Sequence, residues 1–192
     1  IQGFIDNTLK DIHEKYEPES AFAIVISPKT GEILGLGQTP AFNPNTQENL
    51  SSAWSNIFYN SAYEPGSTLK TFTMSIMVEN KIYNPEAYYR SGSYKVDDAT
   101  IFDWNKTGWG TITQRHGFQQ SSNTLMLTLL NELGTEKLKS GLESFGFGRS
   151  TNSLYGNEAT GDLVFNNKVS ASTTVFGQGS TVTAMQMVQA ET

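Results

Sequence analysis

The sequence contains no cysteine, and this absence excludes three kinds of chemistry. Disulfide bonds, thiolate metal sites and cysteine nucleophiles are all ruled out. Basic residues are also scarce, because 13 Lys and Arg stand against 19 Asp and Glu and give a formal net charge of −6. An acidic surface gains nothing from contact with a polyanion, so we expect no nucleic-acid partner.

Long apolar runs and a leader sequence are missing as well. No apolar stretch reaches the roughly 18 residues that a membrane-spanning helix needs. The opening residues, IQGFIDNTLKDIHEKY, carry apolar side chains at helical spacing and lack the pattern of a signal peptide. A helix capped by Thr183 has no stop signal before Thr192. We therefore expect these residues to be part of a longer protein.

The sequence does have enough apolar residues, 37% of 192, to form a packed core. Residues 21–27 and 32–38 are short apolar runs separated by a Pro-Lys-Thr-Gly turn, which predicts a β-hairpin. Residues 67–79 are apolar nearly all round, which predicts a buried central helix. We expect loop over 40–63, irregular structure over 81–112, and further helices over 113–119, 124–133 and 135–145, the last capped by Thr135.

The stretch YEPGSTLKTF, residues 63–72, places a serine and a lysine one helical turn apart. Pro65 and Gly66 predict a turn that delivers Ser67 to a helix N-terminus, where free N–H groups favour an oxyanion. An apolar setting lowers the pKa of a lysine, so Lys70 could take the Ser67 proton. The alternative is an N-cap serine with a solvated lysine, and these ten residues alone leave both open.

A second motif, QQSSNTLM at 119–126, places Ser121, Ser122 and Asn123 between two predicted helices. Alone it describes a helix N-cap. A Ser-x-x-Lys after Glu-Pro-Gly and a Ser-x-Asn roughly 50 residues later together resemble the penicillin-binding transpeptidase and serine β-lactamase superfamily. Further segments are similar to that family's opening hairpin, pre-cleft loop and Gly-Gln-Gly loop, namely 23–45, 98–104 and 176–187. The resemblance is to a class B penicillin-binding protein of the division-associated kind.

This resemblance implies an α/β fold of the β-lactamase/transpeptidase type, with an antiparallel sheet packed against a large α-helical subdomain. Residues 1–192 then form a partial domain, with only the first hairpin of the sheet at 21–38 and a mainly helical part at 63–192. The family's third motif, Lys-Thr/Ser-Gly, occurs at 29–31 and at 106–108, and both copies precede the Ser-x-Asn. We interpret both copies as turns.

Two strands alone could not cover the central helix. We therefore expect a second chain that carries the rest of the domain, with the true triplet beyond Thr192. The resemblance also implies a place at the extracytoplasmic face of the bacterial membrane, anchored by a segment absent from this sequence.

The resemblance further implies roles for individual residues. Ser67 attacks the penultimate D-Ala carbonyl of a peptidoglycan stem peptide, or a β-lactam antibiotic, and Lys70 accepts its proton. Ser121 relays a proton to the leaving D-Ala, and Asn123 binds the peptide amide and Lys70. The Ser67 N–H is one oxyanion donor. These four residues are the expected catalytic set.

Substrate-binding residues are expected as well: Ser122, Trp104 and Gln178. Trp104 is equally compatible with a core aromatic. His13 and His116 have no acidic or His partner at ligand spacing, so no metal and no cofactor are expected.

Two alternatives to a D,D-transpeptidase remain. A D,D-carboxypeptidase or β-lactamase needs water activated against the acyl-enzyme, and no Glu-x-x-Leu-Asn pattern follows the Ser-x-Asn here. A non-catalytic β-lactam sensor would keep the same nucleophile, and only residues 42–45 and 98–104 weigh against it. The transpeptidase is the expected function.

Overall fold

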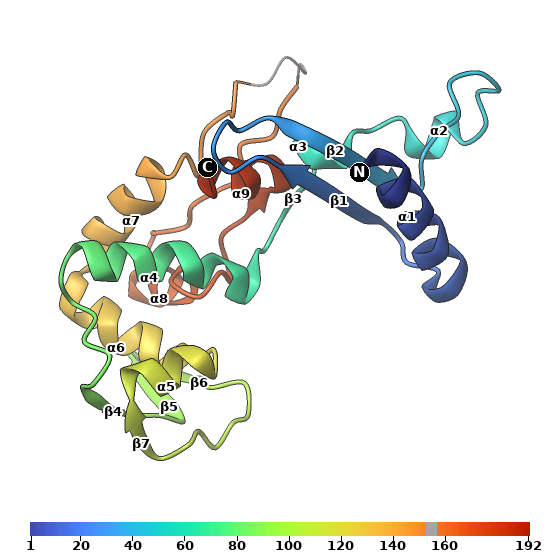
Figure 1. Cartoon of the computed structure of the whole chain (residues 1–192). Helices are drawn as coiled ribbons and strands as arrows, with labels where there is room; N and C mark the ends of the chain where they lie inside the picture. Colours follow the sequence, from blue (N-terminus) through green and yellow to red (C-terminus); the bar gives the residue numbers. More distant parts are fainter. Residues whose placement is uncertain (153–156) are drawn as a thin grey trace. The chain divides into compact units, whose positions relative to one another are not determined.

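The structure is a computed structural model that describes residues 1–152 and 157–192 (Figure 1). The chain forms two compact units. Unit 1 comprises Ile1–Ala62, the described part of Ser150–Thr160, and Thr183–Thr192, and unit 2 comprises Tyr63–Arg149 and Gly161–Val182. None of the helices in the described residues combines the length and hydropathy that crossing a bilayer requires.

Unit 1 contains the predicted hairpin and the predicted first helix. Helix α1 spans Gln2–Tyr16, and strands β1 (Ala21–Ile26) and β2 (Ile33–Thr39) pair antiparallel. Two glycines in β2 let α1 approach, because a Cβ on Gly37 would lie 2.9 Å from the side chains of both Ile5 and Leu9. The hairpin prediction is confirmed.

The opposite face of the hairpin packs on a small core. Leu36 alternates with the glycines of β2, so it points away from α1 and contacts a cluster that includes Phe58 and Met185. Met185 lies on α9 (Ala184–Ala190), which Thr183 caps as predicted by accepting from the Gln186 N–H. Two short helices, α2 (Leu50–Ala53) and α3 (Ile57–Asn60), interrupt the predicted loop.

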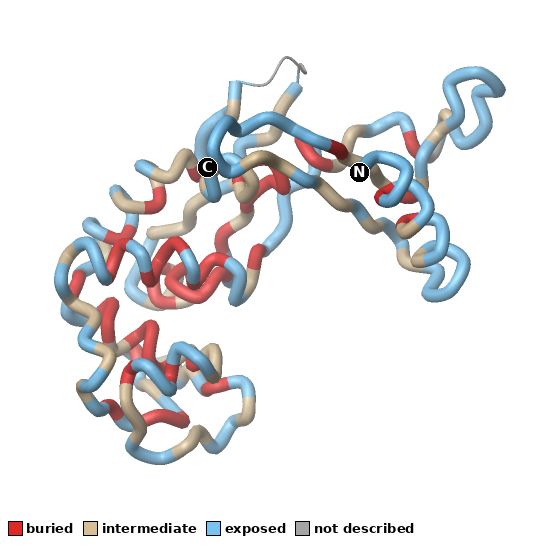
Figure 2. Tube along the Cα trace, viewed as in Figure 1, coloured by how far each residue is buried: buried red, intermediate tan, exposed pale blue. Residues whose placement is uncertain are grey.

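Unit 2 carries the central helix. The 3₁₀ turn η1 (Gly66–Leu69) leads into α4 (Lys70–Glu79), which packs against α6 (Asn123–Leu133) and α7 (Thr135–Ser144). Figure 2 shows buried residues along α4 and α6. The other elements are β4 (Tyr88–Arg90), β5 (Ser93–Val96), β6 (Ala99–Phe102), β7 (Thr111–Thr113), α5 (Gln114–Gln119) and α8 (Lys168–Thr174), with β3 (Ala62–Tyr63) and β8 (Val182–Thr183) where the chain passes between units.

The expectation that the central helix would be left uncovered is wrong. Phe72 is buried, and its ring makes edge contacts with Phe145 at 5.3 Å and Phe147 at 5.1 Å between centroids. Ile76 lies against Gly141 of α7, where a Cβ would be 2.6 Å from the Ile76 Cδ1 atom. Helices of the same unit thus cover α4 without a large sheet.

Residues 81–112 contain four short strands, so the prediction of irregular structure is wrong for these parts of the range. They hold β4 and β7, which pair with each other, and β5 and β6, which form a hairpin across a left-handed Asp97. Strands of three or four residues are too short to show a two-residue period. The polar helix α8 has no apolar stripe and was also not predicted; α7 is preceded by Gly134, with no side-chain cap from Thr135.

Candidate active site

Ser67 lies in η1, directly after the turn that its sequence predicts. Gly66 has a φ of +56°, a region that glycine adopts without strain, and its N–H donates to the Gly177 carbonyl at 2.9 Å. A Cβ on Gly177 would overlap the Gly66 carbonyl, so only glycine allows this approach. The Gly179 N–H donates to the Glu64 carboxylate at 2.9 Å. The Gly-Gln-Gly loop therefore fixes the turn that presents Ser67.

The Ser67 side chain is exposed, and within the described part of the chain its hydroxyl has no hydrogen-bond partner. Near the start of a helix, its backbone N–H belongs to the group that has no acceptor inside the helix. Both features suit a residue that meets a ligand. The α-helix proper begins three residues later, at Lys70.

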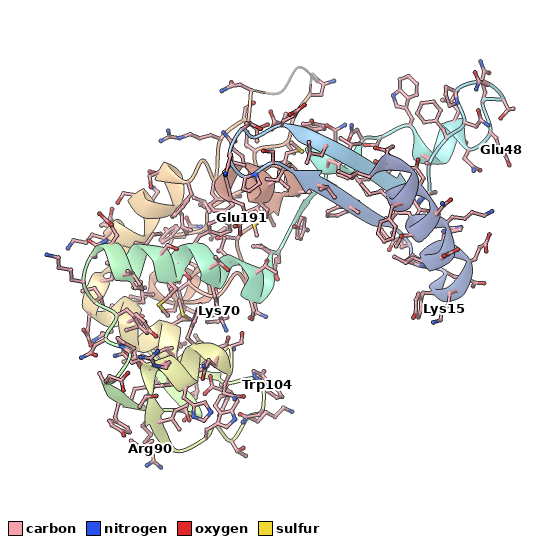
Figure 3. The ribbon with its side chains drawn as sticks, viewed as in Figure 1. Lys15, Glu48, Lys70, Arg90, Trp104 and Glu191 are labelled. Carbon is pink, nitrogen blue, oxygen red and sulfur yellow. The ribbon has the colours of Figure 1, made fainter. Side chains whose placement is uncertain are left out.

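Lys70 lies at the start of α4 (Figure 3) and is only 3% exposed. Nζ donates to the Ser121 carbonyl at 2.5 Å, to Ser121 Oγ at 3.1 Å and to Asn123 Oδ1 at 2.8 Å. Three N–H groups thus meet three acceptors. Burial lowers the pKa of Lys70 to about 8, against the opposing effect of the Asp103 charge.

The expected contact of Lys70 with Asn123 is present, and Ser121 adds two further contacts that were not expected. The Lys70 ammonium group makes no hydrogen bond to the Ser67 hydroxyl among the described residues, although the Lys70 backbone N–H donates to the Ser67 carbonyl. Ser121 has a φ of +54°, which is rare for a residue other than glycine and directs both its carbonyl and its hydroxyl to Lys70. The Asn123 amide also donates to the Phe102 carbonyl at 3.1 Å.

Ser122 faces the other way. It is buried, its hydroxyl donates to Asp103 Oδ1 at 2.9 Å, and it accepts from the Leu125 N–H at 3.0 Å as the N-cap of α6. A hydroxyl engaged on both sides inside the unit has no path to a ligand. The helix-cap interpretation therefore describes Ser122, and Asp103 enters the site as a residue that the sequence did not single out.

Trp104 is 67% exposed, so its interpretation as a core aromatic is wrong. Its indole N–H donates to the Gln120 carbonyl at 2.9 Å, and its ring meets Trp109 edge-on at 5.9 Å. It thereby lies beside the residue that precedes Ser121. Gln178 is exposed in the loop that contacts the Gly66 turn, with its own N–H bonded to the Thr173 carbonyl at 3.0 Å.

The two Lys-Thr-Gly triplets lie in turns, as predicted. The Gly31 N–H donates to the Ser27 carbonyl at 2.8 Å in the turn of the first hairpin. In the second copy, the Lys106 N–H donates to the Asp103 carbonyl and the Gly108 N–H to Asn105 Oδ1, each at 2.8 Å. Both histidines are exposed, and His116 contacts Gln120.

The chain is similar to known proteins over nearly all of its length. The family described as "Penicillin binding protein transpeptidase domain" matches residues 21–192. Stage V sporulation protein D of Bacillus subtilis is 34% identical over 99% of this chain and 30% of its own length. Peptidoglycan D,D-transpeptidase MrdA of Acinetobacter baumannii is 31% identical over 67% of this chain and 21% of its own length.

A solved structure has the same fold. Penicillin Binding Protein 2X from Streptococcus thermophilus superposes with a TM-score of 0.88 at 35% identity, over 98% of this chain and 28% of that one. This chain thus spans less than a third of the length of each of these three relatives. The match over nearly all of residues 1–192 nevertheless fixes its family: the chain belongs to the penicillin-binding protein transpeptidase domains.

Proposed function

We propose that this chain is part of a peptidoglycan D,D-transpeptidase, in which Ser67 forms an acyl-enzyme with a stem peptide and is blocked by β-lactams. The observation that carries the proposal is the buried Lys70 ammonium held by Ser121 and Asn123, one turn after an exposed serine. A surface lysine would need no such cage of acceptors. MrdA, one of the relatives, is named as an enzyme of this type.

Acylation begins with a proton transfer. Lys70 in its neutral form accepts the Ser67 hydroxyl proton while Oγ attacks the penultimate D-Ala carbonyl carbon. A pKa of about 8 leaves about a tenth of Lys70 neutral at pH 7. The Ser67 N–H stabilises the resulting oxyanion.

The intermediate then collapses, and the bond to the terminal D-Ala breaks. Lys70 returns its proton to the leaving amine through the Ser121 hydroxyl, which lies 3.1 Å from Nζ. The amine of a second stem peptide then attacks the ester carbon, the bond to Ser67 Oγ breaks, and the proton that the amine loses passes to Oγ and restores the Ser67 hydroxyl. Asn123 holds Lys70 and binds the peptide amide, while the exposed Trp104 and Gln178 contact the substrate; Ser122 takes no part in binding.

The remaining strands and the Lys-Thr/Ser-Gly triplet belong, in this proposal, to a second chain that completes the domain. Apolar side chains of the hairpin support this, because Leu34 is 41% and Ile33 38% exposed. The proposal also places the protein on the extracytoplasmic face of a bacterial membrane. Mass spectrometry of the native protein tests the second chain, since one continuous polypeptide with all three motifs would contradict it and leave the transpeptidase proposal standing.

The reaction itself is tested with stem pentapeptides and the full-length protein. A transpeptidase releases D-Ala and forms a cross-linked dimer in equal amounts, and the Ser67→Ala variant does neither. Release of D-Ala without dimers would make the protein a carboxypeptidase, and rapid β-lactam turnover would make it a β-lactamase. Stable acylation by penicillin with no reaction on peptide would make it a sensor, and each of these three results would overturn the proposal.

A further inference from the structure

Asp103 is a buried carboxylate in unit 2, 1% exposed, at the end of β6. It accepts four hydrogen bonds: from the Gly92 N–H at 2.8 Å, the Thr124 N–H at 3.0 Å, the Thr124 hydroxyl at 2.8 Å and the Ser122 hydroxyl at 2.9 Å. Hydrogen bonds to a charged acceptor are stronger than neutral ones, and burial strengthens them further. Asp103 therefore holds the backbone and hydroxyl groups that donate to it in fixed positions.

Three of those four donors belong to the first turn of α6 and its cap. Ser122 and Thr124 bond to Asp103, while Ser121 and Asn123, which alternate with them along the chain, bond to Lys70. Residues 121–124 are thus hydrogen-bonded to Asp103 on one side and to Lys70 on the other. Movement of this turn away from Asp103 would separate the three oxygens from the ammonium group.

We infer that Asp103 is a positioning residue that holds Ser121 and Asn123 at the places from which they bind Lys70. The inference rests on the proposed function, because the value of that placement is the activation of Ser67. Asp103 does not touch the substrate. It acts through the backbone and hydroxyls of residues 122 and 124.

The charge of Asp103 has a second effect that can be measured. Burial raises the pKa of Asp103, but its hydrogen bonds from Thr124, Gly92 and Ser122 outweigh burial and leave the pKa below its usual value. The ionised carboxylate in turn raises the pKa of Lys70. Tyr89 also lies close to Asp103, Ser122 and Thr124. Burial raises the pKa of Tyr89, so this side chain stays neutral over the pH range of the test below.

The test compares three variants of the full-length protein by their rates of acylation with a fluorescent penicillin between pH 6 and 9. Asp103→Asn removes the charge and turns one acceptor into a donor. Thr124→Val removes one hydroxyl donor and keeps the shape and the charge. Asp97→Asn, in an exposed left-handed turn that asparagine also tolerates, is the matched control.

We expect acylation by Asp103→Asn to fall at least about tenfold and by Thr124→Val about threefold to tenfold, as the loss of hydrogen bonds to a charged group predicts. The rise of the rate with pH should move to lower pH in Asp103→Asn alone, because Lys70 loses a nearby negative charge. A merely structural defect would lower the rate without that shift. Asp97→Asn should match the wild type in both the acylation rate and its dependence on pH.

Thermal unfolding shows which variants are folded. If Asp103→Asn does not fold, the acylation rate of Thr124→Val tests the positioning role of Asp103. Wild-type rates and an unchanged pH profile in the folded variants would overturn the inference. A wild-type protein that takes up no penicillin would instead overturn the proposed function, so the two failures are distinguishable.

Discussion

The Lys70 ammonium and the Asn123 side-chain oxygen lie 2.8 Å apart, although 53 residues separate them in the sequence. This contact joins the start of α4 to the start of α6, two helices that pack against each other. The two family motifs therefore meet through a buried charge within one compact unit.

The first prediction concerns pH. Lys70 must be neutral to accept a proton, and burial lowers its pKa to about 8. The acylation rate should therefore rise about tenfold per pH unit below that value and level off above it, because the neutral fraction then approaches one. Stopped-flow rates with penicillin check this, and a flat profile between pH 6 and 9 would contradict a base with this pKa.

The second prediction separates a base from a fixed positive charge. Arginine keeps the charge of Lys70 but cannot release its proton. Lys70→Arg should acylate orders of magnitude more slowly, whereas Lys81→Arg, at an exposed position two residues after α4, should behave as wild type. A loss smaller than about tenfold, or roughly 1.4 kcal/mol of barrier, argues against the base.

The third prediction concerns Asn123. Asn123→Ala removes one acceptor from a buried ammonium, which should cost about 1–3 kcal/mol of the free energy of unfolding. It should also lower the pKa of Lys70, since less then favours the charged form. Urea unfolding and the pH–rate profile measure the two effects. Asn131→Ala, exposed on the same helix, serves as the control, and equal results for both variants would count against the contact.

The fourth prediction uses two helical glycines with opposite surroundings. A Cβ on Gly141 would lie 2.6 Å from a buried Ile76 side chain, whereas one on Gly3 meets nothing within 4 Å. Gly141→Ala should lower the free energy of unfolding by about 1–3 kcal/mol through overpacking. Gly3→Ala should raise it by about 0.5–1 kcal/mol through helix propensity. Urea unfolding free energies that change with the same sign in both variants would contradict the packing of α4 on α7.

The sequence allowed prediction of the helices and strands that show a long apolar run, a clear turn or a helix cap. The hairpin at 21–38 consists of two apolar runs joined by a turn, the central helix is a long apolar run after a Pro-Gly turn, and the helices after Thr113 and Ser122 follow residues that favour an N-cap. The motifs mark Ser67, Lys70, Ser121 and Asn123 without any structure. Strands β4–β7 are too short to show a period.

The Asp103 network could not be predicted, because its four hydrogen bonds depend on a fold that brings β6 to the start of α6. An aspartate next to a tryptophan in a polar loop looks like any solvated residue. The coverage of α4 was mispredicted for a related reason. Phe145 and Phe147 follow α7 in the sequence, and only the packing of α7 on α4 brings their rings to Phe72.

The most direct test of the account is to find where penicillin attaches. The full-length protein and its Ser67→Ala variant are treated with penicillin, digested and mapped by mass spectrometry. We expect one stoichiometric adduct, on the peptide that contains Ser67, and none on the variant. An adduct on another residue, or one that persists in Ser67→Ala, would contradict it.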